Sequence, residues 1–471
     1  MTKDGSPSTA YLVDSVPEAQ FYIPATGPAT RPRRTLKHGD TFAVVDSHGD
    51  IGASSGGPDG IFHADTRYLS RLEMLVNGMQ PLLLGSNVRD DNAVLTVDLT
   101  NPDIYYEKHL ALARDTVHIL RTMFLWRGIA YQRFALQNHG DRPVDLNLSL
   151  AFASDFADVF EVRGLRRARR GTAGATVNGQ HNVVLGYQGL DGKLRRATLT
   201  FDPAPSHLSI AAASYTFKLK PGDRRSIFLA MECDGAAQGR PLPFMRAMVR
   251  SFRELKGATS GTTTIETSND VFNQVLCRSM ADLFMLMTDT PQGPYPYAGI
   301  PWYSTTFGRD GLIIAMQMLW CNPGISRGVL RRLAADQAKD YDPEADAQPG
   351  KILHEMRGGE MAALREIPFG LYYGSVDSTP LFVMLAGLYG ERTGDMQTLA
   401  ELWPNIEAAL GWIDGDGDPD HDGFVEYYRK SKTGLANQGW KDSHDAIFHA
   451  DGRLAEGPIA LCEVQIGRAH V

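Results

Sequence analysis

The sequence predicts an antiparallel β-sandwich followed by an all-helical domain, and a change of pattern along the chain supports this. Between Leu36 and about Cys233, short segments of alternating apolar and polar residues are separated by Gly, Asp and Pro, as in sheets of many short antiparallel strands. After Met245 the apolar residues recur three and four positions apart, the period of amphipathic helices. With 471 residues, 43% of them hydrophobic, the chain is long enough for about two or three domains.

The first part begins after a lead-in over residues 1–34, which is rich in Pro, Ser and Thr and is predicted to be mobile. The sandwich is predicted over residues 35–240. Its clearest strand segments are 41–46, 72–76, 93–99, 117–125, 131–137, 145–152, 197–201 and 215–231. Asn77-Gly78 and Pro221-Gly222-Asp223 supply turn residues between strands.

A connecting helix is predicted within the linker 241–264, and the helical domain over residues 265–465. Ser268 or Asn269 can cap its first helix, because their side chains can accept from free backbone N–H groups. The apolar face of that helix is Phe272, Leu276, Met280, Leu283 and Leu286. Further helices are predicted at 310–320, 325–339, 379–392, 396–413 and from 458 onward, with no strands between them.

Composition and charge exclude several classes of partner. A net charge of −8 argues against a nucleic-acid partner, since phosphate binding depends on clustered Lys and Arg. The one basic run, at residues 163–170, is predicted to be a solvated surface turn between strands. No apolar run approaches the roughly 20 residues that cross a bilayer, and no secretory leader is evident, so no membrane partner and a cytoplasmic location are predicted. Four widely spaced cysteines indicate neither a zinc site nor a disulfide framework and are predicted to be small buried hydrophobes: Cys233, Cys277, Cys321 and Cys462.

Residues 437–445, with the sequence NQGWKDSHD, are the segment that most directly indicates a chemistry. The ring of Trp440 can stack on the apolar face of a pyranose, while Lys441 and Asp442 can reach hydroxyls or a glycosidic oxygen. Carboxylates beside a sugar bond are the catalytic groups of most glycosidases. The alternative is a surface loop in which Trp440 covers a helix end.

The other polar clusters also lie in connections between predicted helices, at 302–310, 354–360 and 372–377. Loops at alternate connections of an antiparallel helical layer share one end of it. The clusters are therefore predicted to converge with 440–445 on one pocket.

These clusters, in this order, carry a family resemblance. The segments are Gly299-Ile300-Pro301-Trp302-Tyr303 with Phe307-Gly308-Arg309-Asp310-Gly311, then Tyr372-Tyr373-Gly374-Ser375-Val376-Asp377, then Gln438-Gly439-Trp440-Lys441-Asp442-Ser443, and Glu463-Val464-Gln465. The first part agrees through Lys37-His38-Gly39-Asp40-Thr41-Phe42 and Gly60-Ile61-Phe62-His63-Ala64-Asp65-Thr66-Arg67-Tyr68. Over residues 35–465 the chain resembles the amylo-α-1,6-glucosidase family, the glucosidase part of glycogen debranching enzymes.

The resemblance implies a debranching-type β-sandwich followed by the N-terminal half of a glucoamylase-like (α/α)6 barrel. It implies that a terminal α-1,6-linked glucosyl unit of a glycogen-like α-glucan is hydrolysed with inversion, with no cofactor required. The general acid falls at Asp442, and Arg309 and Asp310 fall at the pair that grips the terminal glucose. The general base of the family lies in the second half of the barrel and is expected beyond Val471, so this chain is predicted to be an incomplete, inactive copy. Its last residues, 466–471, depart from the family and are predicted to be a foreign tail.

Predicted substrate contacts are Trp302, Arg309, Asp310, Asp377, Trp440, Lys441 and Glu463. Several have structural alternatives. Asp442 could cap a helix or pair with Lys441, Asp310 could cap the helix over 310–320, and Asp377 is either a helix cap or the second candidate for the acid. The loop with His354, Glu355, Arg357 and Glu360 is either a sugar subsite or a salt-linked loop.

The acidic run Asp414, Asp416, Asp418, Asp420 and Asp422 places carboxylates at every second position, as in calcium loops. Arg429 stands where an EF-hand needs its bidentate Glu, so a helix-to-helix turn is the preferred interpretation and calcium the alternative.

Two other functional classes remain open. One is an α-glucoside hydrolase or phosphorylase of the same architecture that acts on a disaccharide. The other is a non-catalytic carbohydrate-binding protein. The sequence leaves the oligomeric state open.

Overall fold

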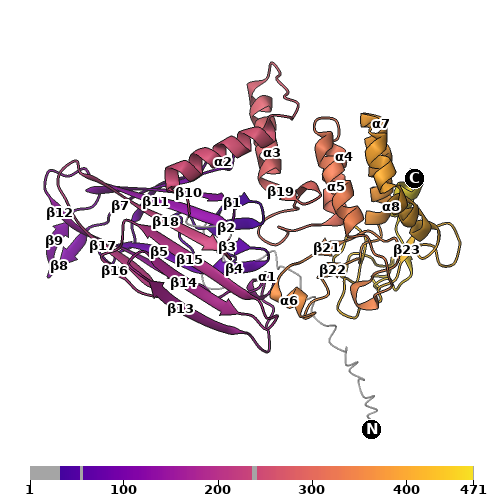
Figure 1. Ribbon diagram of the computed structural model, residues 1–471, viewed down its shortest axis with the longest axis horizontal. Helices are drawn as coiled ribbons and strands as arrows, with labels where there is room; N and C mark the ends of the chain where they lie inside the picture. Colours follow the sequence, from indigo (N-terminus) through magenta and orange to yellow (C-terminus); the bar gives the residue numbers. More distant parts are fainter. Residues whose placement is uncertain (1–31, 53–56, 236–240, 470–471) are drawn as a thin grey trace, which may run out of the picture.

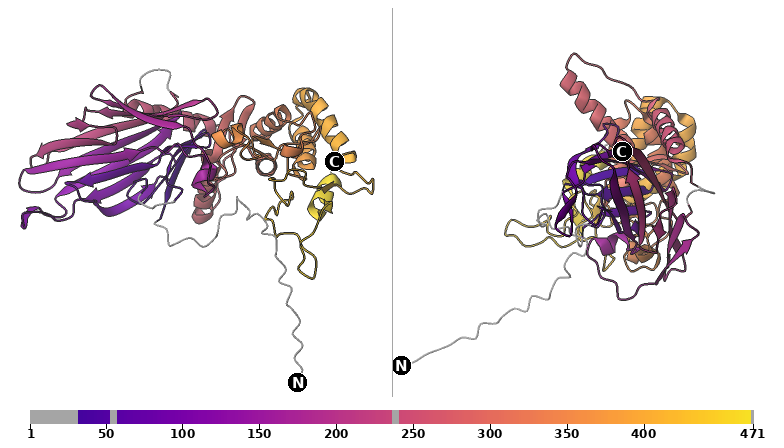
Figure 2. Two further views of the ribbon diagram at one scale, coloured as in Figure 1. Left: turned by 90° about the horizontal axis from the view of Figure 1, so that it is seen from below. Right: turned by 90° about the vertical axis from the view of Figure 1, so that its left-hand side faces the viewer.

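The computed structural model describes residues 32–52, 57–235 and 241–469. Most of the predicted lead-in and the last two residues of the predicted tail lie outside these ranges. Figures 1 and 2 show the sandwich strands at one end of the molecule and most of the helices at the other, with helix α2 (Phe244–Thr259) running over the sandwich. The predicted fold class, a β-sandwich followed by a helical part, is confirmed.

The sandwich is built from antiparallel sheets. The larger has eight strands in the order β13-β14-β15-β18-β11-β10-β7-β6. Their bounds are β6 Leu82–Val88, β7 Leu95–Thr100, β10 Val117–Trp126, β11 Ile129–Asn138, β13 Thr172–Asn178, β14 Asn182–Gln188, β15 Leu194–Asp202 and β18 Arg224–Cys233. The facing sheet has the order β16-β17-β12-β5, with β5 Arg71–Val76, β12 Val144–Ala153, β16 His207–Leu208 and β17 Ala212–Leu219.

Apolar side chains of both sheets meet in one buried cluster. On β12, Leu146, Leu148 and Leu150 are buried while their sequence neighbours are more exposed, the period-two pattern by which the strand was predicted. Leu99 of β7 and Phe134 of β11 complete the cluster from the facing sheet. The alternation in the sequence therefore reports which face of each strand points inward.

A further sheet and a hairpin, formed largely by strands that the sequence did not predict, complete the first part. The sheet contains β1 Arg34–His38, β2 Thr41–Val45, β3 Gly60–His63 and β4 Thr66–Leu69, and the hairpin β8 Ile104–Tyr106 and β9 His109–Leu112. The edge strand β13 was missed because all of its residues are exposed, so that burial imposes no alternation on its sequence.

The helices agree with the predicted ones to within a few residues at most of their ends. They are α2 Phe244–Thr259, α3 Asp270–Leu286, α4 Gly308–Met318, α5 Pro323–Ala335, α7 Ser378–Thr393, α8 Met396–Asp414 and α9 Cys462–Ala469, with the shorter α1 Val159–Val162, η1 Pro343–Ala345 and α6 Glu360–Ala363. The Asn269 side chain accepts from Phe272 N at 3.1 Å and caps α3 as expected. A buried cluster between α4, α5, α7 and α8 forms the second core.

Two expectations about this part were wrong, one about strands and one about where the last helix begins. Strands do occur between the helices, as short ladders that join β19 Met287–Thr290 to β20 Gly293–Pro296, β21 Glu355–Met356 to β22 Leu371–Tyr372, and β23 Glu426–Tyr427 to β24 Ile459–Ala460. The last helix begins at Cys462 rather than at 458, because residues 459–460 pair with β23. It continues to Ala469, past the position where the predicted tail begins.

The prediction of a solvated turn for the basic run at 163–170 is wrong for two of its arginines, which lie between the sandwich and the helical part, whereas Arg166, Arg169 and Arg170 are exposed. The side chain of Arg167 is 1% exposed, and its guanidinium donates to Glu360 at 2.8 Å and to Glu366 at 2.6 Å. The Arg163 guanidinium lies 5.6 Å from the ring centroid of Trp302. These interactions join the two parts. Without such partners, burial of the arginine charges would be unfavourable.

Two smaller findings complete the fold. Cys233 and Cys321 are buried as predicted, whereas Cys277 and Cys462 are exposed, so the prediction for all four is wrong in half of the cases. Within the described ranges, no helix combines the length and the apolar character that a membrane crossing requires.

Candidate active site

The site begins at the first turn of α4, where close backbone packing requires glycine. Gly308 N donates to His354 O at 2.8 Å, and a Cβ at Gly308 would lie 1.9 Å from Leu353 O. The Tyr295 hydroxyl donates to Phe307 O at 2.7 Å from the other side. The start of α4 is thereby fixed, and with it Arg309 and Asp310 in the first helical turn.

Arg309 brings together the segments that the sequence predicted to converge. Its Nη1 donates to Asp377 Oδ2 at 3.1 Å and to Gly439 O at 2.9 Å, and its Nη2 lies 3.4 Å from Asp442 Oδ2. Burial disfavours the guanidinium charge, but Asp377, Asp310 and Asp442 outweigh burial and raise the pKa of Arg309. Arg309 is therefore a fixed cation between two carboxylates.

Asp377 occupies the N-cap position of α7, but its carboxylate does not cap that helix. It accepts instead from the Ser375 hydroxyl and from Arg309. The Ser375 hydroxyl also lies 2.7 Å from the Ser378 hydroxyl, so that the carboxylate is held by a buried network. Its Oδ2 faces the Arg309 guanidinium, so the side chain binds within the polar cluster and does not cap the helix.

The two other carboxyl groups of the cluster both have raised pKa values. For Asp442 partial burial raises the pKa, Arg309 opposes this, and Asp377 adds to it. For Asp310 burial is again the largest cause and Arg309 the opposing charge. The sequence suggested Lys441 as the cation beside Asp442, but the ion-pair partner in the structure is Arg309. A raised pKa favours the protonated form, which a general acid requires.

The remaining predicted contacts surround this cluster at different depths. Trp440 is 60% exposed and Lys441 is also exposed, so both face solvent next to Asp442. Glu463 lies behind the segment, since a Cβ at Gly439 would come within 3.1 Å of its Oε1. Trp302 lies at the boundary with the sandwich, where its ring packs near Phe160 and Phe369 and below Arg163.

The loop with His354, Glu355 and Arg357 is salt-linked, which is one of the two interpretations that the sequence left open. The Arg357 guanidinium is buried and donates to Glu355 Oε1 at 2.6 Å and to Asp65 Oδ1 at 2.9 Å. His354 is also buried, in edge-to-face contact with Phe307 and Tyr372, and burial and nearby cations lower its pKa well below the usual value. Because His354 O accepts from Gly308 N, the loop supports the start of α4, which carries Arg309.

The acidic run begins at the end of α8 and leads to strand β23. It connects a helix to a strand, so the predicted helix-to-helix turn is wrong. Carboxylate oxygens of Asp418, Asp420 and Asp422 lie within 4.8 Å of one another. Asp418 is buried and accepts from Gly423 N at 3.1 Å, and Asp422 accepts from Phe424 N at 2.8 Å. Oxygen ligands at this spacing suit a calcium ion, which stays the alternative interpretation of the run.

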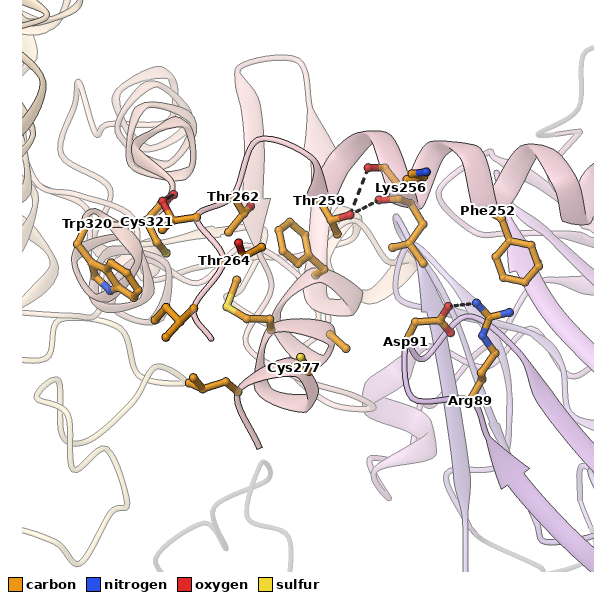
Figure 3. A pocket seen from close by; sticks show the side chains of 17 residues that line it. Arg89, Asp91, Phe252, Lys256, Thr259, Thr262, Thr264, Cys277, Trp320 and Cys321 are labelled. Carbon is orange, nitrogen blue, oxygen red and sulfur yellow. Dashed lines mark hydrogen bonds and ion pairs between the residues drawn. The ribbon is translucent and has the colours of Figure 1, made fainter. Parts of the chain in front are cut away.

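An apolar groove lies elsewhere, between α2, α3 and residues 320–321 (Figure 3). It has a volume of about 570 Å³ and includes Phe252, Leu276, Met280 and Phe284 among its lining residues. None of the predicted site residues lines it. Its charged lining residues are Arg89, Asp91 and Lys256, none of which belongs to the carboxylate cluster around Arg309, so the groove is not the candidate site.

Three residues that hold the site together were not singled out from the sequence: Asp346, Tyr372 and Ser375. Tyr372 and Ser375 stand within the second segment of the resemblance, where their side chains went unassigned. Asp346 is one of several acidic residues in its loop, with Asp340, Asp342 and Glu344, and no local pattern distinguishes the buried one from the more exposed ones.

The comparisons with known proteins agree with this architecture. Residues 36–230 match the family described as the N-terminal domain of (some) glycogen debranching enzymes. Among curated protein sequences nothing matches. A protein assigned as a kojibiose phosphorylase, from the human microbiome, has a similar structure, with a TM-score of 0.55 and 10% identity over 84% of this chain and 58% of its own. A bacterial glucoamylase solved with acarbose has a TM-score of 0.49 and 10% identity, over 81% of this chain and 62% of its own.

The chain thus spans less than two thirds of either solved protein. At 10% identity the likeness to the phosphorylase establishes the fold alone. The first part of this chain is similar in sequence to the N-terminal domain of some glycogen debranching enzymes, and 84% of the chain shares its fold with part of that phosphorylase.

Proposed function

We propose that this chain carries the acid half of a glycoside hydrolase site that removes α-1,6-linked glucosyl units from glycogen-like α-glucans. The observation that supports it most is the Arg309 guanidinium between Asp377 and Asp442, beside the exposed ring of Trp440. The similarity of residues 36–230 to a debranching-enzyme domain favours an α-glucan as the substrate class.

The proposed reaction is an inverting hydrolysis. Asp442 donates its proton to the glycosidic oxygen as the bond between that oxygen and C1 breaks. A water attacks C1 from the opposite face and gives its proton to a general base, with the two carboxyl groups about 6.5 to 9.5 Å apart. The prediction that this base lies beyond Val471 stands with the proposal.

The other side chains position the sugar. Arg309 and Asp310 hold hydroxyls of the terminal glucose, which fixes C1 relative to the acid. Trp440 stacks on the ring, and Lys441 reaches an outer hydroxyl. Asp377 orients Arg309, while Glu463 and Trp302 shape the surroundings of the two segments.

A choice of leaving group tests the acid. Isomaltose, two glucose units joined α-1,6, needs a proton on its leaving oxygen, whereas α-glucosyl fluoride releases fluoride with little help. Asp442→Asn is expected to lower turnover of isomaltose by about 10²- to 10⁴-fold and to leave that of the fluoride much less affected. Because the base is expected beyond Val471, turnover is measured in a chain extended through the full barrel, and binding also in the 471-residue chain.

Asp445→Asn is the matched control, because Asp445 is an exposed aspartate three positions away in the same segment. Equal losses on both substrates would contradict an acid role for Asp442. Glucose 1-phosphate formed only with inorganic phosphate present would favour the phosphorylase alternative. Isomaltose binding without turnover in either length, unaffected by Asp442→Asn, would favour a carbohydrate-binding protein.

A further inference from the structure

We propose that Asp346 is a positioning residue for the sugar site, because it fixes the segment that carries Trp440 and Asp442. The inference rests on the proposed function. Asp346 follows the short helix η1 and is 3% exposed, in a loop distant in sequence from the segments that it joins. Its backbone has φ 50°, a left-handed conformation that aspartate and asparagine tolerate better than most residues.

Each oxygen of the Asp346 carboxylate accepts two hydrogen bonds. Oδ1 accepts from the backbone N–H groups of Lys430 at 2.7 Å and Ser431 at 2.9 Å. Oδ2 accepts from the Tyr372 hydroxyl at 2.9 Å and from Gln438 Nε2 at 3.2 Å. A carboxylate that accepts four donors has its accepting capacity filled, and bonds to an ionised acceptor are the stronger kind.

These bonds hold both ends of one stretch, residues 430–438. The Tyr372 hydroxyl also accepts from Leu435 N at 2.8 Å, so the middle of the stretch is tied to the same point. Apart from the two-residue strands β23 and β24, residues 415–461 contain no helix or strand. Regular backbone pairing therefore cannot order this stretch, and the buried carboxylate does so instead.

The fixed end of the stretch leads directly into the site. Val376 N donates to Gln438 O at 2.8 Å, and Gly439 O accepts from Arg309 at 2.9 Å. Gln438 is 1% exposed, whereas Asp442 four residues later has a side chain that is 47% exposed. The segment thus leaves a buried anchor at Gln438 and emerges at the acid, so that loss of the anchor would displace Trp440 and Asp442 together.

Substitution of Asp346 by glycine removes all four bonds and tolerates the left-handed backbone. Asp346→Asn retains one oxygen and the backbone conformation, and so tests rescue by a conservative change. Tyr372→Phe removes only the hydroxyl that joins Asp346 to Leu435. Asp340→Gly is the matched control, since Asp340 is an exposed aspartate in the same loop. All four variants are made in the 471-residue chain.

The first measurement is amide hydrogen exchange without sugar, which tests the anchor independently of any activity. Asp346→Gly is expected to speed exchange over residues 430–442 by about tenfold or more, with Asp346→Asn intermediate and Asp340→Gly unchanged. Unchanged exchange in this stretch in folded Asp346→Gly would overturn the inference. If Asp346→Gly does not fold, the same comparison is made with Asp346→Asn and Tyr372→Phe.

The second measurement is the dissociation constant for isomaltose, from the change in tryptophan fluorescence of the chain. Asp346→Gly is expected to weaken binding by about tenfold, the equivalent of one or two lost hydrogen bonds, with partial rescue in Asp346→Asn. Faster exchange with unchanged affinity would show that the stretch does not position the sugar, and would overturn the inference. If Asp346→Gly speeds exchange as expected but the unmodified chain binds no isomaltose, the proposed function is refuted, and the positioning role with it. The structural role of Asp346 as the anchor of the stretch would then still stand.

Discussion

Asp65 of the β-sandwich accepts a hydrogen bond from the guanidinium of Arg357 in the helical part at 2.9 Å, with both side chains buried. Its other oxygen accepts from Gly358 N at 2.8 Å. Arg357 in turn donates to the backbone carbonyl of Trp302 at 2.7 Å. One aspartate of the sandwich therefore supports the loop in which Trp302 and Tyr303 lie.

Asp65→Asn is expected to destabilise the chain by about 2 to 4 kcal/mol, because it leaves the buried Arg357 with half of its compensating charge. Asparagine tolerates the left-handed backbone of this residue, so the effect isolates the charge. Urea unfolding provides the measurement. Asp141→Asn, on an exposed turn, is the control, and equal stability of the two variants would contradict a structural role for the pair.

Gly308→Ala is expected to weaken isomaltose binding and lower stability, because the added methyl would meet Leu353 O at 1.9 Å and displace the first turn of α4. Gly411→Ala provides the contrast. Gly411 lies inside α8 with open space around its Cβ position, so alanine there should raise the free energy of unfolding by about 0.5 to 1 kcal/mol. Calorimetric melting of both variants checks the opposite signs, and a common sign would refute the packing argument.

The lowered pKa of the buried Lys37 should make the free energy of unfolding depend on pH. Its Nζ donates to Thr288 Oγ1 at 2.7 Å across the boundary, and burial lowers its pKa to about 7 against the attraction of Asp40 and Asp289. Unfolded lysine keeps its proton to about pH 10.4, so between these values the unfolded chain binds more protons and stability rises with pH.

The slope due to Lys37 is at most about 1.4 kcal/mol per pH unit. Lys37→Met should flatten the rise of unfolding free energy between pH 7 and 10 by up to that amount, as measured by urea titration at each pH. Lys339→Met, at an exposed lysine, should leave the slope as it is. Parallel curves for wild type and Lys37→Met would show that Lys37 is charged in both states.

The raised pKa of Asp442 predicts the alkaline side of the activity profile. A general acid acts in its protonated form, so hydrolysis of isomaltose should fall as pH rises through the pKa of Asp442. Turnover of α-glucosyl fluoride should lack this fall, since its leaving group needs little protonation. The measurement is the turnover rate of the extended chain on both substrates across the pH range. If both rates fall on the alkaline side, the fall belongs to a group other than Asp442.

How far the sequence predicts the site can be followed residue by residue. Arg309, Asp377 and Asp442 were predicted as one cluster because each stands in a polar loop between helical segments, and the structure joins them through ion pairs. The position of Trp302 could not be predicted, because its neighbours Phe160 and Arg163 come from the other part of the chain. The roles of Arg167 and Asp346 were hidden for the same reason, since a charge is placed in the interior by partners that are distant in sequence.

The sequence by itself determined the order of the two parts, most of the longer helices and the residues that carry the proposed chemistry. Helices and strands bury one face, and this gives their apolar residues a regular spacing that can be recognised in the sequence. Tertiary structure alone decided which charges are buried and paired. Arg357 and Arg163 look like surface arginines in the sequence, and only the approach of the sandwich to the helical part encloses them. The physical reason is that local patterns record the contacts of one segment with the core, whereas the ion pairs and hydrogen bonds that shape this site join segments far apart in the chain.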